Sequence, residues 1–196
     1  MKKLLSTVAI TLLLSSAQLF AAPINYQIDI KGAHASINFK IKHLGFSFLT
    51  GRFNSFSGTF IYDKETPENS EINITIDTNS VDSNHQKRDK HIRSEDFLFT
   101  EKFPEATFKS TSYTATNDTS GTLSGTLTLR GISKDISINI TKIGEGNDPW
   151  GGHRVGFEGS TLLKLKDFGI PKYLGPQSET VELNLHIEGI REKKEQ

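Results

Sequence analysis

Apolar and polar residues alternate along most of the chain with a period of two. Between residues 37 and 42, Ile37, Phe39 and Ile41 share one parity, and the residues between them are polar. This alternation is typical of a β-strand with one buried and one solvated face. The pattern predicts eight strands, centred on residues 37–41, 56–62, 72–76, 106–110, 123–129, 136–140, 155–165 and 181–187.

The connections between these strands predict their direction. They are short and rich in Gly, Asn, Asp and Pro, as at 63–69, 117–121 and 144–152. Neighbouring strands joined in this way are antiparallel, because parallel strands need long crossovers. The period of two disappears only between Val81 and Phe103, where the charged run 86–93 predicts a short helix that starts from a cap at Ser83 or Asn84 and ends near Ser94.

Eight antiparallel strands with one apolar face each must hide that face in a two-sheet sandwich or a closed barrel. We favour an all-β fold in which the eight strands close into an antiparallel barrel with one short helix. Small residues interrupt the inward row at Gly58, Ala106, Ser110, Gly125 and Gly159. They either mark bends that let the sheet curve or leave an open space along the barrel axis, and the two readings are compatible.

The first residues predict an export signal. Lys2 and Lys3 precede an apolar run from Leu4 to Leu14, and small residues follow up to Ala22. The run is too short to span a bilayer. We expect residues 1–21 to be removed, Ala22 to become the N-terminus give or take one residue, and residues 22–196 to form a single barrel domain in a bacterial periplasm or outside the cell.

Composition narrows the function classes. The 196 residues include no cysteine, which excludes disulfide frameworks, thiol chemistry and cysteine zinc sites. The 23 basic and 23 acidic residues balance, whereas a nucleic-acid binder needs an excess of Lys and Arg, so we expect no nucleic-acid partner. Nine of the thirteen phenylalanines fall in 46–60 and 97–108. Segments 43–53 and 97–104 read as loops that carry too much apolar bulk for solvent, so they either plug a barrel end or meet an apolar ligand.

Polar residues of the predicted helix are candidates for the mouth of the barrel. We expect Arg88, Asp89 and His91 to lie there, in a salt-bridged network that fastens the helix. His85, Asp89 and His91 lack the spacing of a metal site, and the chain has no serine elbow or spaced carboxylate pair. We therefore expect no catalytic residue, metal or cofactor. Trp150, the only tryptophan, is expected to pack over a barrel end rather than stack on a sugar.

Several separate segments carry a family resemblance. They are HASINF (34–39), KHLG (42–45), GRF (51–53), RDKHIRSEDF (88–97), FPEATF (103–108), LTLRGISK (127–134), DPWGGHRVGFE (148–158) and KDFG (166–169). With these segments, nearly the whole chain after the export signal resembles the YceI-like family of secreted polyisoprenoid-binding proteins. Ser133-Lys134 and His153 depart from residues common in that family, and these changes affect only surface detail.

The resemblance implies a lipocalin-like barrel that holds a long isoprenoid or related amphiphile in its lumen, without a catalytic requirement. The ligand is expected to be a polyisoprenoid, an isoprenoid quinone or a fatty amide-like lipid. The residues expected to line the lumen and its mouth are Phe39, Ile41, His43, Phe46, Phe48, Phe53, Phe60, Ile74, Ile76, Phe108, Leu127, Phe157, Leu163 and Leu183.

Two alternatives stay open. One is an enzyme that acts on such a lipid with His43, Arg88, Asp89 or His91, and the other is a ligandless, stress-related barrel. The sequence is also compatible with a homodimer.

Overall fold

The computed structural model describes residues 24–171 and 175–192. Its strands are β1 (Ile24–Ile28), β2 (Ser36–His43), β3 (Ser47–Phe53), β4 (Phe56–Tyr62), β5 (Glu71–Asp77), β6 (Val81–Asp82), β7 (Glu105–Ala115), β8 (Ser120–Leu129), β9 (Ile132–Asn147), β10 (His153–Lys164) and β11 (Thr180–Arg191). One α-helix, α1 (Gln86–Arg93), and four short 3₁₀ turns, η1 (Pro67–Asn69), η2 (Thr78–Ser80), η3 (Leu165–Phe168) and η4 (Pro176–Ser178), complete the described part. None of the described helices is long and apolar enough to cross a bilayer.

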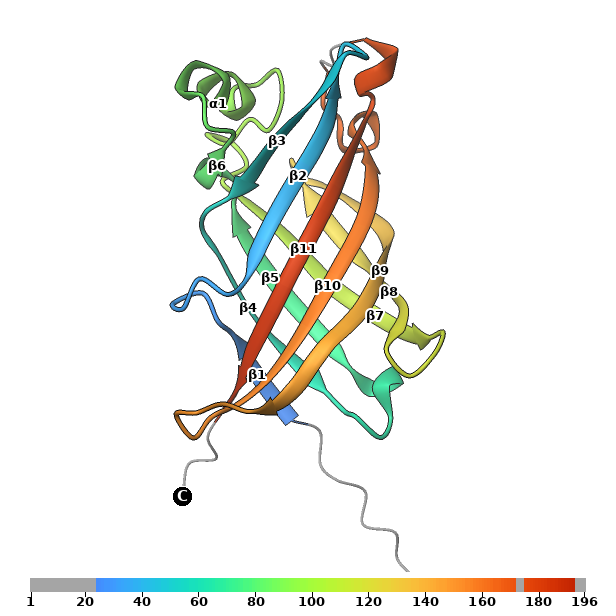
Figure 1. Ribbon diagram of the computed structural model, residues 1–196. Coiled ribbons are helices and arrows are strands. Elements are labelled where there is room, and N and C mark those ends of the chain that lie inside the picture. The colour runs from blue at the N-terminus through green and yellow to red at the C-terminus, as the bar shows by residue number, and fades with distance from the viewer. Residues whose placement is uncertain (1–23, 172–174, 193–196) are drawn as a thin grey trace, which may run out of the picture.

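The strands form one antiparallel sheet that closes on itself (Figure 1). Strand β1 pairs with β4 on one side and β11 on the other, which completes a ring in the order β1-β4-β5-β7-β8-β9-β10-β11. Strand β2 continues the line of β1 along β11, and β3 runs on into β4. The barrel therefore has eight strand positions, two of which are interrupted strands.

The predicted eight-stranded antiparallel barrel with one helix is confirmed. Two local predictions were wrong. Segment 43–53, read as a loop, contains β3, in which Leu49 and Phe53 line the interior while Phe48 and Thr50 stay exposed. Helix α1 starts from His85 rather than Ser83 or Asn84, and the His85 ring nitrogen Nδ1 accepts a hydrogen bond of 3.2 Å from the Arg88 amide. The predicted export signal lies outside the described residues.

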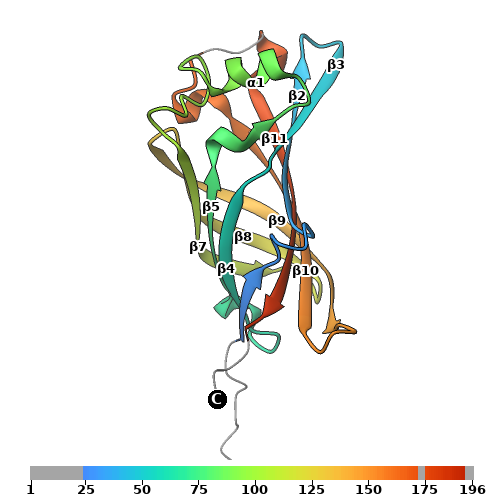
Figure 2. The same ribbon diagram turned by 90° about the vertical axis from the view of Figure 1, so that its left-hand side faces the viewer.

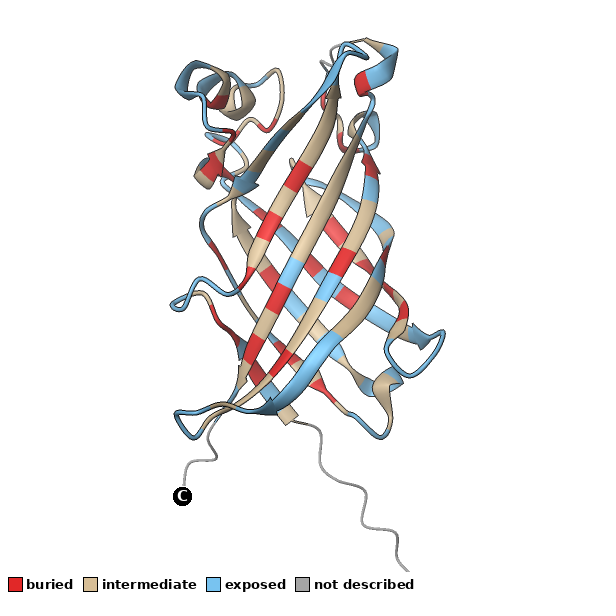
Figure 3. Ribbon diagram, in the orientation of Figure 1, coloured by how far each residue is buried: buried red, intermediate tan, exposed pale blue. Residues whose placement is uncertain are grey.

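Buried and exposed positions alternate along the strands, as Figure 3 shows. The clearest case is β8, where Gly121, Leu123, Gly125 and Leu127 are buried and the residues between them are partly exposed. The register follows from this pattern, because a slip of one residue would turn every apolar side chain toward solvent.

The two ends of the barrel differ (Figures 1 and 2). We call the end that carries α1, the β2–β3 hairpin and η4 the helix end, and the opposite end, with the β9–β10 turn, the turn end. The turn end is packed with large side chains: Tyr26 stacks on Phe60 at 5.1 Å between ring centroids, and Phe157 meets Phe60 edge-on at 5.9 Å. Below these rings, Lys142 donates a hydrogen bond of 3.2 Å to the Tyr62 hydroxyl. The turn end is thus filled by its own side chains.

Candidate functional site

The helix end encloses a cavity of about 220 Å³. The cavity lies inside the barrel, surrounded by the inward faces of the strands. Helix α1 and the loop that follows it cover one side of the cavity. Its lining consists of Ile37, Phe39, Ile41, Leu49, Phe53, Ile76, Val81, Arg88, His91, Ile92, Phe97, Leu98, Ala106, Leu127, Leu129, Leu163, Leu165, Ile170, Val181 and Leu183. All of these residues are apolar except Arg88 and His91, both of which come from α1. Such a cavity favours an apolar ligand over water.

The small inward residues explain only part of this space. Ala106 lines the cavity. At Gly125 and Gly159, by contrast, the space that a side chain would take is already occupied by neighbouring atoms. A methyl group at Gly125 would lie 2.5 Å from the Phe108 ring, and one at Gly159 would lie 3.0 Å from Ile140. The glycines therefore leave room for large side chains of the neighbouring strands, and the open-space interpretation is wrong for them.

Helix α1 is fastened over the cavity by hydrogen bonds to the segment that precedes it. Asp89 is buried and accepts hydrogen bonds from the Ser83 amide (2.8 Å) and hydroxyl. Arg88 donates through Nε to the Ser83 hydroxyl (2.7 Å) and through Nη2 to the Ser83 carbonyl (2.6 Å). Burial alone raises the pKa of Asp89, but the Ser83 hydrogen bonds outweigh it and lower the pKa below its usual value. Arg88 and Asp89 are thus held chiefly by hydrogen bonds through Ser83 rather than by the predicted salt bridges, and His91 Nε2 lies 3.0 Å from the Asp96 carboxylate.

A groove of about 640 Å³ on the outer surface lies next to the cavity. It runs between the upper edge of β3 and α1, because β6 pairs with only Arg52 and Phe53 of β3 and leaves the rest of that edge without a partner strand. We call this groove the seam. Leu49, Arg88 and His91 line both the seam and the cavity, so the two spaces adjoin. The seam therefore places a solvent-exposed groove directly beside the cavity.

The structure separates the predicted site residues into groups. Those that line the cavity are Phe39, Ile41, Phe53, Ile76, Leu127, Leu163, Leu183, Arg88 and His91. His43 and Phe48 line the seam, and Phe46 is exposed at the hairpin tip. Four others pack away from the cavity: Phe60, Ile74 and Phe157 at the turn end, and Phe108 beside Leu123 and Leu127. Ligand contact by any of these predicted site residues stays a prediction.

Three further predictions concern loops and polar residues. Trp150 does not pack over a barrel end: it is 79% exposed at the β9–β10 turn, with the Arg154 guanidinium 5.8 Å from its ring, so that prediction was wrong. Segment 97–104 does cover the cavity, through Phe97 and Leu98. Asp89 is turned toward Ser83 and not into the cavity.

Sequence reasoning missed about half of the lining. Ile37 and Val181 were available from the alternation, because they share the parity of Phe39 and Leu183 on the same strands. Leu98, Leu165 and Ile170 lie outside the long strands, where no periodic pattern marks the inward side. Leu98, Leu165 and Ile170 reach the cavity because of how the loops and 3₁₀ turns fold over the barrel end.

A group of ionic side chains lies away from the cavity, toward the turn end. Asp29, His34 and Glu188 bring carboxylate and ring atoms within 4.8 Å of one another, which is close enough to hold a cation. Arg154 Nη1, however, lies 2.7 Å from Asp29 and 2.5 Å from Glu188, so the guanidinium already supplies the positive charge. Burial raises the pKa of Asp29, but hydrogen bonds from Arg154, His34 and the Gly32 amide outweigh it and lower the pKa to about 2. This arrangement is a structural ion-pair network.

The cavity offers apolar contacts and two polar side chains. In its described lining only Arg88 and His91 are polar, and His91 Nε2 also lies 3.0 Å from the Asp96 carboxylate. Arg88 and His91 can donate hydrogen bonds to a polar group at the point where the cavity meets the seam.

Comparison with known proteins gives consistent matches. Residues 26–189 match the family model of the YceI-like domain. A UPF0312 protein of Pseudomonas paraeruginosa is 52% identical over 193 residues, covering 98% of this chain and 100% of the relative. The crystal structure of the Campylobacter jejuni YceI protein superposes with a TM-score of 0.71 at 30% identity, over 78% of this chain and 91% of that one.

A third similar protein is known by its ligand class. A polyisoprenoid-binding domain from Saccharophagus degradans, implicated in plant cell wall breakdown, superposes with a TM-score of 0.60 over 86% of this chain and 99% of that domain. At 18% identity the likeness extends to the fold alone.

Proposed function

The chain belongs to the YceI-like family, and on this premise we propose that it is an exported carrier that holds a long isoprenoid or related amphiphilic lipid in its barrel. The observation that carries the proposal is the apolar cavity of about 220 Å³ at the helix end, which adjoins a surface groove and has polar lining only from α1.

The chemistry of the lining favours a hydrocarbon chain. Each methylene that leaves water for such a surface contributes about 0.8 kcal/mol. A chain that is longer than the cavity of about 220 Å³ continues into the adjoining seam, where Arg88 and His91 can meet polar atoms of the lipid.

The isoprenoid class is supported by the polyisoprenoid-binding domain of Saccharophagus degradans, which has the same fold. An isoprenoid quinone or a fatty amide offers the same combination of a long apolar chain and one polar group. Export is supported by the charged and apolar leader in residues 1–21. A carrier in an aqueous compartment such as the periplasm needs this kind of cavity, because it must shield the chain from water.

A binding role is better supported than catalysis. The polar groups near the cavity have partners within the protein: Asp89 accepts hydrogen bonds from Ser83, and His91 Nε2 lies 3.0 Å from the Asp96 carboxylate. The family and the polyisoprenoid-binding neighbour point in the same direction.

The test is to purify the protein from its own host without detergent, extract it with organic solvent and identify the extract by mass spectrometry. We expect one long-chain lipid class in a stoichiometric amount. An extract without lipid, together with no uptake of prenyl or acyl chains by the stripped protein, would refute the carrier proposal.

A series of prenyl alcohols tests how the chain is held. Geraniol, farnesol and geranylgeraniol have ten, fifteen and twenty carbons, so the length of the chain rises in equal steps against one cavity of about 220 Å³. If the seam holds the rest of the chain, affinity rises at each step. Affinity that is equal for all three alcohols would contradict a role for the seam.

A further inference from the structure

An apolar tip projects from the helix end. The β2–β3 hairpin carries Leu44, Phe46 and Phe48, which are 51%, 89% and 61% exposed. We call residues 44–48 the hairpin tip. The other exposed large apolar residues of the described chain, Ile132, Ile143, Trp150 and Leu162, are scattered over other strands and turns. Scattered apolar residues are ordinary on a protein surface, whereas three within five residues of one hairpin indicate a contact surface.

Folding does not explain the residues of this tip. The Phe46 amide donates to the His43 carbonyl (3.0 Å), and both central residues of the turn have positive φ, 51° at Leu44 and 85° at Gly45. Turns of this kind favour Asn, Asp or Gly. A leucine there adopts an unfavourable backbone conformation and gains little burial in return. The apolar character of the tip is therefore better explained by a contact outside the barrel.

Two cationic side chains flank the tip on one side. The seam beside it is lined by Lys87 and Arg88 together with the histidines His43, His85 and His91, and none of its described lining residues carries a carboxylate. Lys40 lies over the Phe48 ring, with Nζ 5.2 Å from the ring centroid, and its charge is paired with Glu182 at 2.7 Å. Aromatic rings next to Lys and Arg are the combination that binds the interface of an anionic bilayer.

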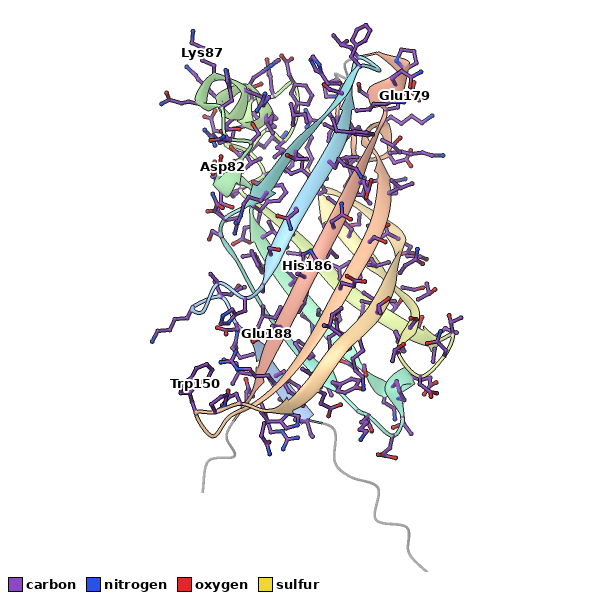
Figure 4. All side chains as sticks on the ribbon, in the orientation of Figure 1. Asp82, Lys87, Trp150, Glu179, His186 and Glu188 are labelled. Carbon is purple, nitrogen blue, oxygen red and sulfur yellow. The ribbon has the colours of Figure 1, made fainter. Side chains whose placement is uncertain are left out.

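We propose that the hairpin tip inserts into the interface of an anionic phospholipid bilayer, with the helix end facing the membrane. This orientation brings the seam to the bilayer surface, next to the exposed α1 residue Lys87 that Figure 4 labels at the helix end. Docking itself needs no bound lipid. A role of membrane docking in loading lipid into the cavity rests on the proposed carrier function.

The charge of the seam argues for a bilayer and against a second copy of the chain. Two copies that met symmetrically through their tips would bring Lys87 and Arg88 of both chains to the same interface. Like charges facing each other in this way oppose association. An anionic surface instead meets the seam with complementary charge.

Flotation with vesicles tests the proposal. The lipid-free protein is purified from an exporting host, and wild type and variants are compared with the same N-terminus. We expect binding to vesicles of phosphatidylglycerol and phosphatidylethanolamine, little binding to phosphatidylcholine, and weaker binding as salt rises. The double variant Phe46→Ser/Phe48→Ser should bind at least tenfold more weakly, and Lys87→Gln about fivefold more weakly. Trp150→Ser, which removes an equally exposed ring from the turn end, is the matched control and should bind like wild type.

The single tryptophan gives a second readout. Trp150 lies at the turn end, far from the hairpin tip (Figure 4), so its fluorescence should not change when anionic vesicles are added to wild type. In the variant Trp150→Phe/Phe46→Trp, the emission should shift to the blue, because the new ring enters the bilayer interface.

Several results would overturn the proposal. They are a spectral shift of Trp150 in wild type, no shift in Trp150→Phe/Phe46→Trp, or unchanged flotation of the double serine variant. A dimer in sedimentation velocity that disappears in the double serine variant, with no vesicle binding by wild type, would identify a second copy as the partner. None of these results depends on bound lipid, so the carrier proposal is tested separately by extraction.

Discussion

Ala106→Leu tests whether the cavity at the helix end is the place where the ligand binds. Ala106 lies on β7, is buried, and is the only one of the small inward residues noted from the sequence that lines the cavity. Leucine adds three carbon atoms, which occupy part of the 220 Å³ in the absence of ligand. At about 0.8 kcal/mol per buried carbon, the lipid-free protein gains up to about 2 kcal/mol of stability.

The same substitution should weaken lipid binding. A bound chain must leave the volume that the new side chain fills, and it loses about 2 kcal/mol of apolar contact, which is roughly thirtyfold in affinity. Unfolding in urea, without ligand and with geranylgeraniol, measures both effects. Wild type should gain more stability from the ligand than the variant does.

Ala35→Leu is the matched control. Ala35 is as buried as Ala106 but does not line the cavity, and it belongs to the core cluster that includes Tyr26 and Ile28. Overpacking there costs about 1–3 kcal/mol and leaves ligand affinity unchanged. If Ala106→Leu destabilises the lipid-free protein as much as Ala35→Leu does, the cavity is not open space. If it leaves the affinity for geranylgeraniol unchanged, the ligand binds elsewhere.

Three other predictions concern the groups around the cavity and the barrel ends. Asp29 has a pKa of about 2 in the folded protein, against 3.8 as its ordinary value, so its share of stability, roughly 2 kcal/mol, is complete above pH 4 and is lost as pH falls toward 2. The Asp29→Asn variant should therefore unfold at a lower urea concentration than wild type at pH 7, but lose less unfolding free energy than wild type between pH 4 and pH 2. If the unfolding free energies of the two proteins fall in parallel over this range, the Asp29 carboxylate is not the stabilising group. Gly125→Ala places a methyl group 2.5 Å from the Phe108 ring and the Lys109 carbonyl, and should cost about 1–3 kcal/mol of unfolding free energy without changing affinity for geranylgeraniol. Asp89→Ala leaves the Ser83 donors unpaired, so we expect a loss of about 1–3 kcal/mol and faster hydrogen exchange confined to α1, whereas uniform exchange changes would show that α1 is not held separately.

The fold could be predicted from the sequence because the strands are amphipathic. Alternation such as that of Ile37, Phe39 and Ile41 identifies one buried face per strand, and short connections make the neighbours antiparallel. Segment 47–53 escaped this reading because Phe46 and Phe48 are apolar on the solvated side, which hides the period of two. The exception coincides with the proposed membrane contact, and functional surfaces are where local patterns are expected to fail.

The cavity could be predicted only in part. Periodicity states which residues point inward, but not how far each side chain reaches across the lumen. Gly125 and Ala106 both looked like missing volume, yet Phe108 fills the space over Gly125 while the space at Ala106 stays open. The difference depends on the register between strands and on the loop that carries Leu98, and neither is encoded in the alternation of one strand.

The unequal filling of the barrel separates stability from binding. A cavity of about 220 Å³ costs roughly 5 kcal/mol relative to a filled core, at ~24 cal/mol per Å³. That cost is a large fraction of the net stability of a typical domain, so an unfilled helix end requires a well-packed remainder. The stacked rings of Tyr26 and Phe60 and the ion pairs of Arg154 with Asp29 and Glu188 lie away from the cavity. Because a ligand that fills the cavity recovers part of this cost, the lipid stabilises the fold in proportion to the apolar volume that it occupies.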